Sequence, residues 1–400
     1  MPEQRIEQLF LVPGSTKAEV ATWGAAVLEF AAYFPGVLIS HDYADALRPE
    51  FERITIVEPD SWADDLWTMI KQNPRPLAVE KLNAPTPEVL AEILHVRVYY
   101  GLRFGFQTEY DWKQQWPAGV SLIGLHGRSD GNLQGTDYDV VQKARIEVIK
   151  LTSHAEPKTL ERLRTINPGL FIMVRPILNF NNDGRAMRIS PQEFFDATVK
   201  DMQRLFDYDA NIQYIEVHNE PNLVIEGLGG WWTNGKEFGT WFDEVVRLYK
   251  ERWPGKKYGF PGLSPGGNMN NVRQAMRQFL GEAALAAARS DWVAVHGYWI
   301  SEREMTEPIH GFTWQIYREF FPDKLLFITE FGNPAQPKQL VAEQYSRYYG
   351  ILRHVAGLGG AVSYVVSTSN SVESPRWAWR DENGLDAGIA AEVGLRRYIR

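Results

Sequence analysis

The chain of 400 residues contains no cysteine, which excludes disulfide bonds, thiolate metal sites and a cysteine nucleophile. It also lacks long apolar runs. No stretch approaches the roughly 18 continuous apolar residues of a membrane span, so we expect no membrane insertion. The first residues, MPEQRIEQLFLVPG, have a short apolar run broken by Pro and Gly and no cationic start, which makes a poor signal peptide. We therefore expect a cytoplasmic location by default.

An excess of basic residues is missing as well. The formal net charge is -8, and because nucleic acids and anionic membranes bind basic surfaces, neither is an expected partner. The acidic residues are unevenly placed: residues 1–117 hold 10 Lys and Arg against 17 Asp and Glu, a balance of -7 that leaves -1 for residues 118–400. This asymmetry predicts two domains, residues 1–117 and residues 118–400.

The second predicted domain contains eight short apolar runs that alternate with longer amphipathic segments. The runs are residues 120–127, 145–152, 170–177, 214–221, 258–265, 292–299, 325–332 and 360–367. One intervening segment begins with Ser190, Pro191 and Glu193, the order of an N-cap, a first helical residue and a capping box. Eight strands separated by helices predict an α/β fold of the (β/α)8 TIM barrel type. A doubly wound open sheet is the alternative, but no G-x-G-x-x-G follows the first run.

Residues 1–117 are predicted to form a small α/β domain of unknown role. QLFLVPG (8–14) and RITIVEP (53–59) are typical of short strands, and residues 17–34 are typical of an amphipathic helix. Thr86, Pro87 and Glu88 have the composition of a further helix start. Residues 106–119 are a predicted linker.

Candidate site residues close three of the eight runs. They are His218, Asn219 and Glu220 in the fourth run, His296, Tyr298 and Trp299 in the sixth, and Glu330 in the seventh. Glu220 and Glu330 are the candidate catalytic residues, and the others are candidates for substrate binding. In a (β/α)8 barrel the active site lies at the carboxyl ends of the strands, so Glu220 and Glu330 are predicted to face each other across the barrel mouth. Glycoside hydrolysis uses such a pair: one carboxyl protonates the leaving oxygen, and in retaining enzymes the other attacks the anomeric carbon.

The motifs HNEPN, HGY and ITEFG at these three ends resemble those of the retaining glycoside hydrolases of clan A, which include cellulases, mannanases, xylanases and β-glycosidases. The resemblance implies that Glu220 is the acid/base, that Glu330 is the nucleophile and that Asn219 contacts a sugar 2-hydroxyl. It also implies that His296 belongs to the site and that the Tyr298 hydroxyl lies next to the nucleophile.

Two features depart from the clan pattern. Many clan members have an arginine near the end of the second strand, whereas here the arginine at a strand end is Arg175, in the third run. Many have a tryptophan that closes the eighth strand, whereas the nearest here are Trp377 and Trp379. These departures leave the sugar and the linkage open.

Several further residues are candidates for substrate binding, each with a structural alternative. Arg175 either helps to keep Glu330 ionised or forms a structural ion pair, and His218 either contacts substrate or is a satisfied core residue. Asn179, Asn181 and Asn182 shape the loop after the third run, and one of them is a candidate contact. Sugar rings stack on exposed aromatic faces. The candidate stacking platforms are Trp231, Trp232, Trp299, Trp377 and Trp379, whose alternative role is to pack loops.

The sequence thus predicts a retaining glycoside hydrolase that acts on β-linked glycans or glycosides without a cofactor. A metal site made of His218, His296 and a glutamate is conceivable, but no helix carries H-E-x-x-H, and no metal is expected. The alternatives are a non-catalytic carbohydrate-binding barrel, a transglycosylase that uses the same carboxylates, and an enzyme whose first domain binds a larger assembly or surface.

Overall fold

The computed structural model describes residues 8–48, 51, 53–58, 61–72, 78–82, 84, 86–100, 116, 118–321, 324–355, 357–369, 374–381 and 384–398. The chain divides into two compact units, Met1–Asp111 with Tyr317–Asp323, and Trp112–Ile316 with Lys324–Arg400. Residue 117, the predicted boundary, and most of the predicted linker lie outside the described residues. The division at residue 117 therefore stays a prediction.

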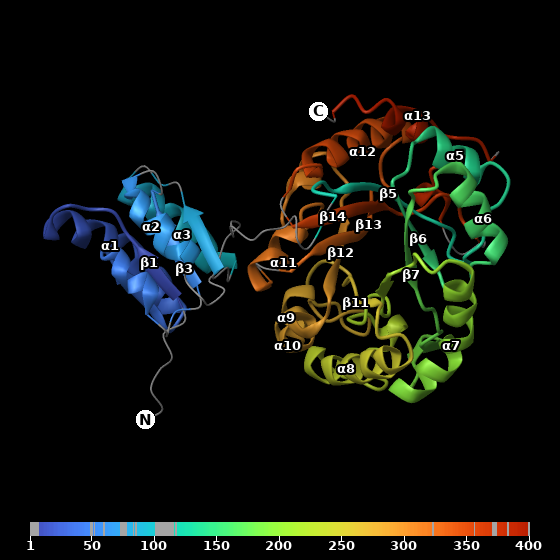
Figure 1. Cartoon of the computed structure of the whole chain (residues 1–400), viewed down its shortest axis with the longest axis horizontal. Helices are drawn as coiled ribbons and strands as arrows, with labels where there is room; N and C mark the ends of the chain where they lie inside the picture. The colour runs from blue at the N-terminus through green and yellow to red at the C-terminus, as the bar shows by residue number, and fades with distance from the viewer. Residues whose placement is uncertain are drawn as a thin grey trace. The chain divides into compact units, whose positions relative to one another are not determined.

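A parallel sheet with the strand order β2-β1-β3-β4 forms the first unit (Figure 1). Its elements are β1 (Gln8–Leu11), α1 (Lys17–Tyr33), β2 (Val37–Ser40), η1 (Tyr43–Leu47), β3 (Arg53–Val57), α2 (Asp64–Gln72), β4 (Ala78–Leu82) and α3 (Pro87–Tyr100). Alternate residues of β1 point to opposite faces: Phe10 packs with Phe30 of α1, while Leu9 and Leu11 pack with Leu66 of α2. Burial on both faces explains why β1 is continuously apolar. The predicted small α/β fold is confirmed.

The eight apolar runs form eight strands of a closed parallel barrel, in the order β10-β11-β12-β13-β14-β5-β6-β7. The strands are β5 (Leu122–His126), β6 (Val148–Thr152), β7 (Phe171–Arg175), β10 (Tyr214–Glu216), β11 (Lys257–Phe260), β12 (Trp292–Tyr298), β13 (Leu326–Gly332) and β14 (Leu358–Ser363). Because β5 pairs with both β6 and β14, the sheet closes on itself. The (β/α)8 prediction is confirmed, and the open sheet is excluded.

Helices surround the barrel strands (Figure 1). They are α5 (Asp137–Lys143), α6 (Pro157–Ile166), α7 (Pro191–Tyr208), α8 (Gly235–Arg252), α9 (Met276–Glu282), α10 (Ala284–Arg289), α11 (Trp314–Phe320), α12 (Lys338–Leu352) and α13 (Ile389–Gly394). Short elements in the connections are β8 (Asn181–Asn182), β9 (Arg185–Ala186), η3 (Val224–Glu226), η4 (Arg303–Thr306) and η5 (Pro375–Trp377). The capping box predicted at Ser190 and Glu193 is present at the start of α7. No helix among the described residues has the length and apolarity needed to cross a bilayer.

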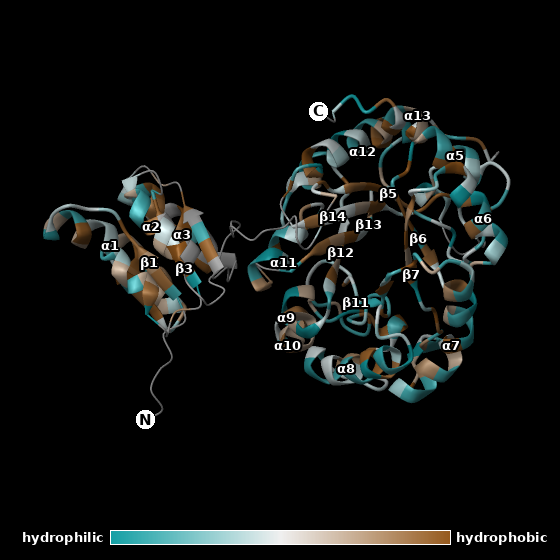
Figure 2. Ribbon diagram, viewed as in Figure 1, coloured by the Kyte–Doolittle hydropathy of each residue, from teal (hydrophilic) through white to brown (hydrophobic). Residues whose placement is uncertain are grey.

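Aromatic side chains fill the barrel at the amino ends of its strands. The cluster contains Trp116, Phe171, Tyr214, Trp292 and Phe327, with Trp116 Nε1 donating to Val120 O at 2.8 Å. Figure 2 shows the apolar colouring of the strands against the more hydrophilic outer helices. The aromatic cluster thus fills the barrel at the amino ends of the strands, and the polar candidate residues lie at the opposite, carboxyl ends.

Candidate active site

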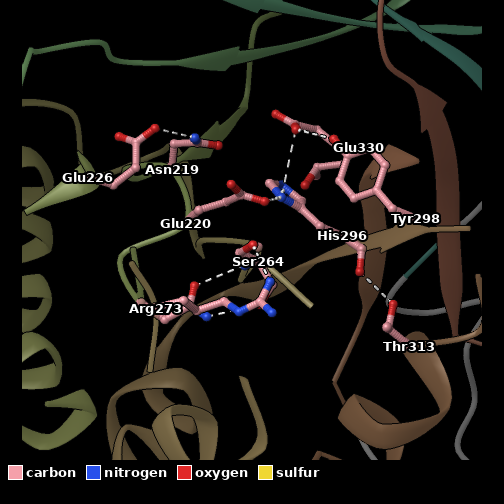
Figure 3. Close-up of polar contacts among 12 residues, drawn as sticks. Asn219, Glu220, Glu226, Ser264, Arg273, His296, Tyr298, Thr313 and Glu330 are labelled. Atoms are coloured by element: carbon pink, nitrogen blue, oxygen red, sulfur yellow. Dashed lines mark hydrogen bonds and ion pairs between the residues drawn. The ribbon is translucent and has the colours of Figure 1, made fainter. Parts of the chain in front are cut away.

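Glu220 and Glu330 meet at the carboxyl ends of the barrel strands. Glu330 lies in β13, and Glu220 lies just beyond the end of β10. One carboxylate oxygen of each residue lies within 4.8 Å of the other and of a ring nitrogen of His296, which belongs to β12 (Figure 3). The structure therefore brings the two predicted carboxylates together, and with them a histidine from β12, the strand next to β13.

Three side chains donate hydrogen bonds to Glu330. The Tyr298 hydroxyl donates to Oε2 at 2.7 Å, Arg175 Nη1 donates to Oε1 at 2.7 Å, and Lys150 Nζ donates to Oε1 at 3.1 Å. Burial alone would raise the pKa of Glu330, but the positive charges of His296, Lys150 and Arg175 hold that pKa well below its usual value. Glu330 is consequently ionised at neutral pH, the state in which a carboxylate can act as a nucleophile.

Glu220 has a more open environment than Glu330. Its side chain is 15% exposed, against 7% for Glu330, and its Oε1 lies 2.8 Å from Nδ1 of His296. Burial works to lower the pKa of His296, but Glu330, Glu216 and Glu220 raise it to about 9. The His296 ring is therefore protonated at neutral pH and donates to Glu220, which leaves the rest of the Glu220 carboxyl facing the cleft.

The Asn219 side chain is held between a cation and a carboxyl. Its Oδ1 accepts a hydrogen bond from Arg175 Nη1, and its Nδ2 donates to Glu226 Oε1 at 2.7 Å. Arg175 thus links Asn219 to Glu330. Burial raises the pKa of Glu226 to about 7, so this carboxyl titrates near neutral pH. Glu226 was not anticipated from the sequence, because it lies in η3, within a loop that has no strand periodicity.

A buried ion pair lies below the two catalytic candidates and was also missed. Lys150 Nζ of β6 lies 2.5 Å from Glu216 Oε2 of β10, and both side chains are fully buried. Burial alone would raise the pKa of Glu216, but Lys150 and its neighbours hold it below the usual value. Both residues interrupt apolar runs, RIEVIKLT and YIEVHNEP, which is the signal that could have found them. Lys150 also supplies a cation from the second strand, where the clan pattern has an arginine.

The backbone is bent around Glu220. His218 has φ of 84° and Glu220 has φ of 38°, both in the left-handed region, and such conformations cost about 1–3 kcal/mol each. The Glu220 backbone N–H donates to Gly262 O at 3.0 Å. A Cβ atom on Gly262 would lie 2.2 Å from the His296 ring. The absence of a side chain at Gly262 therefore allows His296 to approach Glu220.

His218 is absent from the residues that line the cleft over the paired carboxylates. Its Nδ1 lies 2.6 Å from Asn219 N, and its ring packs against Phe180, Trp232 and Trp241 at centroid distances of 4.5, 5.3 and 5.6 Å. Burial lowers the pKa of His218 to about 3, so the ring is neutral. His218 supports the bend that presents Asn219 and borders only the hollow next to the main cleft.

The tryptophans divide between the cleft and the core. Trp377 lines the cleft with its ring centroid 5.1 Å from that of Tyr298, and Trp231 is 46% exposed on the loop after β10. The predicted sugar contacts of three others need correction: Trp232, Trp299 and Trp379 are at most 1% exposed. Their indole N–H groups donate to Pro221 O, Gln344 Oε1 and Ser363 Oγ, so these rings pack loops and present no face to a sugar.

A cleft of about 590 Å³ runs over the paired carboxylates. Its lining residues are Arg175, Asn219, Glu220, Ser264, Pro265, Gly266, Arg273, Tyr298, Ile309, His310, Glu330, Tyr364 and Trp377. A neighbouring hollow of about 460 Å³ shares Arg175 and Asn219 with it and includes Asn179 and Glu226. Asn179 thus borders the site, whereas Asn181 and Asn182 form β8 and line neither space.

Among the described residues, the group with metal-ligand spacing is Glu220, His296 and Glu330, and it does not include His218. These three do not fit a metal well. The proton on His296 occupies a ring nitrogen, and the Glu330 oxygens already accept from Tyr298, Arg175 and Lys150. A divalent cation would also meet the charges of Lys150 and Arg175. The arrangement is better suited to proton transfer and charge stabilisation.

No protein-family model matches the chain, and no curated protein sequence matches it. Solved structures do resemble it. A glucosidase from Croceicoccus marinus has 13% sequence identity and a TM-score of 0.51 over 69% of this chain and 67% of its own. A β-D-glucuronidase from Dictyoglomus thermophilum has 12% identity and a TM-score of 0.47 over 69% of this chain and 50% of its own. At these identities, the likeness to the glucosidase shows a shared barrel fold.

Proposed function

We propose that the chain is a retaining glycoside hydrolase that cleaves β-linked glycans or glycosides. The observation that carries this proposal is the placement of Glu220 and Glu330 in one cleft, with an oxygen of one within 4.8 Å of an oxygen of the other. Retaining enzymes hold their carboxyls about 5–5.5 Å apart, whereas inverting enzymes need about 6.5–9.5 Å to admit a water molecule. The barrel fold shared with a glucosidase is consistent with this assignment.

In the first step, a Glu330 oxygen attacks the anomeric carbon while Glu220 donates a proton to the leaving oxygen. Tyr298 and Arg175 orient the Glu330 carboxylate through their hydrogen bonds. Formation of the glycosyl–enzyme bond neutralises Glu330. In the second step, the ionised Glu220 accepts a proton from water, whose oxygen attacks the anomeric carbon and releases Glu330.

The distinct environments of the two carboxyls support these roles. Glu330 is enclosed by donors that favour its ionised form, and Glu220 is more exposed and has one cationic neighbour, His296, within hydrogen-bonding distance. A non-catalytic sugar-binding barrel would have no need of this pairing. A transglycosylase would use the same residues, with a sugar hydroxyl in place of water in the second step.

The proposal is tested with aryl β-glycosides and with β-glucan, mannan and xylan. Glu330→Ala and Glu220→Ala are compared with the intact protein, and Glu251→Ala, on the exposed surface of α8, is the matched control. We expect Glu330→Ala to lower kcat by about 10³-fold or more and Glu251→Ala to leave it unchanged. Activity that survives Glu330→Ala undiminished overturns the nucleophile assignment.

Stereochemistry separates retention from inversion. NMR spectra recorded during the first minutes of hydrolysis should show the β-anomer of the released sugar. An α-anomer as first product would contradict the double displacement while leaving hydrolysis intact. Adding a sugar or alcohol acceptor and measuring transfer products distinguishes the transglycosylase.

A further inference from the structure

Arg273 lines the active-site cleft together with Glu220 and Glu330, yet the hydrolytic mechanism gives it no task. It lies on the segment that follows β11. In Figure 3 its side chain and Ser264 lie on the side of Glu220 away from Glu330. Arg273 is therefore a cation available to substrate rather than to the reacting bond.

The guanidinium of Arg273 is held in a fixed position. Its Nε donates to Gly267 O at 3.0 Å, and its Nη1 donates to Ser264 Oγ at 3.3 Å. The group lies against Gly266, where a Cβ atom would come within 2.7 Å of Nη2. Gly266 also has φ of 108°, which only glycine adopts readily. The loop is thus shaped to accommodate the guanidinium.

A buried amide fixes this loop next to the catalytic segment. Asn222, two residues after Glu220, has no exposed surface, and its Nδ2 donates to Ser264 O at 2.9 Å and to Gln274 O at 3.1 Å. Its Oδ1 accepts from Ser264 N at 2.9 Å. Asn222 therefore ties both ends of the Arg273 segment to the HNEPN motif, and the position of the guanidinium is coupled to that of Glu220.

Among the described residues, the groups that bind the Arg273 guanidinium are uncharged. Its hydrogen-bond acceptors are a carbonyl and a hydroxyl, and within the described part of the chain it forms no ion pair with a carboxylate. Arg175, in the same cleft, is by contrast paired with Glu330. A preoriented guanidinium with unused N–H groups binds carboxylates and other oxyanions through short, charge-assisted hydrogen bonds.

We propose that the sugar bound beside Glu220 carries an oxyanion, either the carboxylate of a uronic acid or a sulfate ester, and that Arg273 binds it. This inference rests on the proposed glycosidase function and narrows its substrates to acidic glycans or glycosides. The competing explanation is that Arg273 only fastens its own loop through Gly267 and Ser264.

The kinetic test compares substrates that differ only in charge. The pairs are aryl β-glucuronide with aryl β-glucoside, glucuronoxylan with xylan, and a sulfated with an unsulfated β-glucan. For the preferred acidic member, Arg273→Gln should lower kcat/KM by about 10- to 100-fold, with less than a threefold change for its neutral partner. Arg273→Lys should retain part of the preference, and Arg247→Gln, on the exposed face of α8, should change neither. The uronate and sulfate pairs identify the anion.

Direct binding keeps the inference testable in the absence of turnover. Calorimetry with acidic and neutral oligosaccharides on the intact protein should show that the acidic ligand binds at least tenfold more tightly. Added salt should reduce this difference in affinity, and Arg273→Gln should abolish it. Such binding without hydrolysis would refute the proposed function but sustain the anion site. Equal affinity or equal kcat/KM for both members of every pair, or an equal loss for both in Arg273→Gln, would overturn the anion site and leave the hydrolase assignment in place.

Discussion

The Tyr298 hydroxyl stabilises the ionised form of Glu330 through a hydrogen bond of 2.7 Å. Tyr298→Phe removes that donor while keeping the ring beside Trp377, so the pKa of Glu330 should rise. The acid limb of the kcat/KM profile should therefore move to higher pH, with about a 10- to 100-fold loss in kcat/KM at its optimum. Hydrolysis rates measured across pH, with Tyr208→Phe on the exposed surface of α7 as control, test this. An unmoved acid limb would contradict the role given to Tyr298.

Lys150 compensates two buried carboxylates, Glu216 at 2.5 Å and Glu330 at 3.1 Å. Lys150→Met removes the nearer cation of Glu216 and leaves it with the more distant His296, whose Nε2 lies 3.6 Å from Oε1, so we expect a loss of about 3–5 kcal/mol in the free energy of unfolding. Because the pKa of Glu216 is held below its usual value, the stabilisation that Lys150 provides is present above about pH 4.5 and fades as the pH falls through the folded-state pKa. Urea unfolding at several pH values measures both effects.

The double variant Lys150→Met/Glu216→Gln is the control for that experiment. It removes both charges, so it should recover part of the stability that Lys150→Met loses. If the single and double variants are equally unstable at neutral pH, the loss comes from packing around the lysine stem and not from the removal of the nearer cation from Glu216.

Residues that close the apolar runs were placed at the cleft by the sequence, whereas only some of the loop residues around it, such as Trp377 and Asn179, were candidates. Glu220 and Glu330 could be found because the order of the strands around a closed barrel follows the order of the runs in the chain. Arg273 and Glu226 reach the site through loop paths that depend on tertiary contacts such as those of Asn222. The roles of the tryptophans could not be predicted either, because composition alone does not show which indole rings are buried in the core and which line the cleft.

The contact between β11 and β12 can be tested at Gly262, just after β11. A methyl group there would lie 2.2 Å from the His296 ring, so Gly262→Ala should push His296 away from Glu220 or shift the strand end. We expect about a 100-fold loss in kcat and about 1–3 kcal/mol of destabilisation. Gly255→Ala is the matched control, because no atom lies within 4 Å of the Cβ position at Gly255. An unchanged kcat in Gly262→Ala would show that catalysis does not depend on the contact between His296 and Glu220.

The barrel strands and the start of α7 could be predicted from the sequence, whereas the backbone bend at the end of β10 could not. Both faces of a barrel strand are buried, which makes the strands continuous apolar runs that can be recognised without a partner. The start of α7 was marked by its own capping box. The bend that gives His218 and Glu220 positive φ could not be predicted, because the surrounding aromatic rings and the Gly262 carbonyl hold it.

At the scale of the whole molecule, the described residues that line the cleft fall between residues 118 and 400. The first unit has its own sheet, with an apolar cluster on each face. We therefore expect residues 112–400, which keep Trp116 in the barrel core, to fold when produced alone and to hydrolyse small aryl glycosides with kcat/KM within about threefold of the intact chain, since a separate core is the mark of a domain. Circular dichroism, thermal unfolding and kinetics on both forms measure this.

Large and small substrates together separate two roles for the first unit. If the first unit binds an assembly or a polysaccharide surface, its removal should lower activity on insoluble glycans and leave activity on aryl glycosides unchanged. The reason is that binding at a second site raises the effective concentration of substrate only when one substrate can occupy both sites. If residues 112–400 fold but lose activity on both substrates, the first unit contributes to catalysis, and the assignment of the entire site to the barrel is wrong.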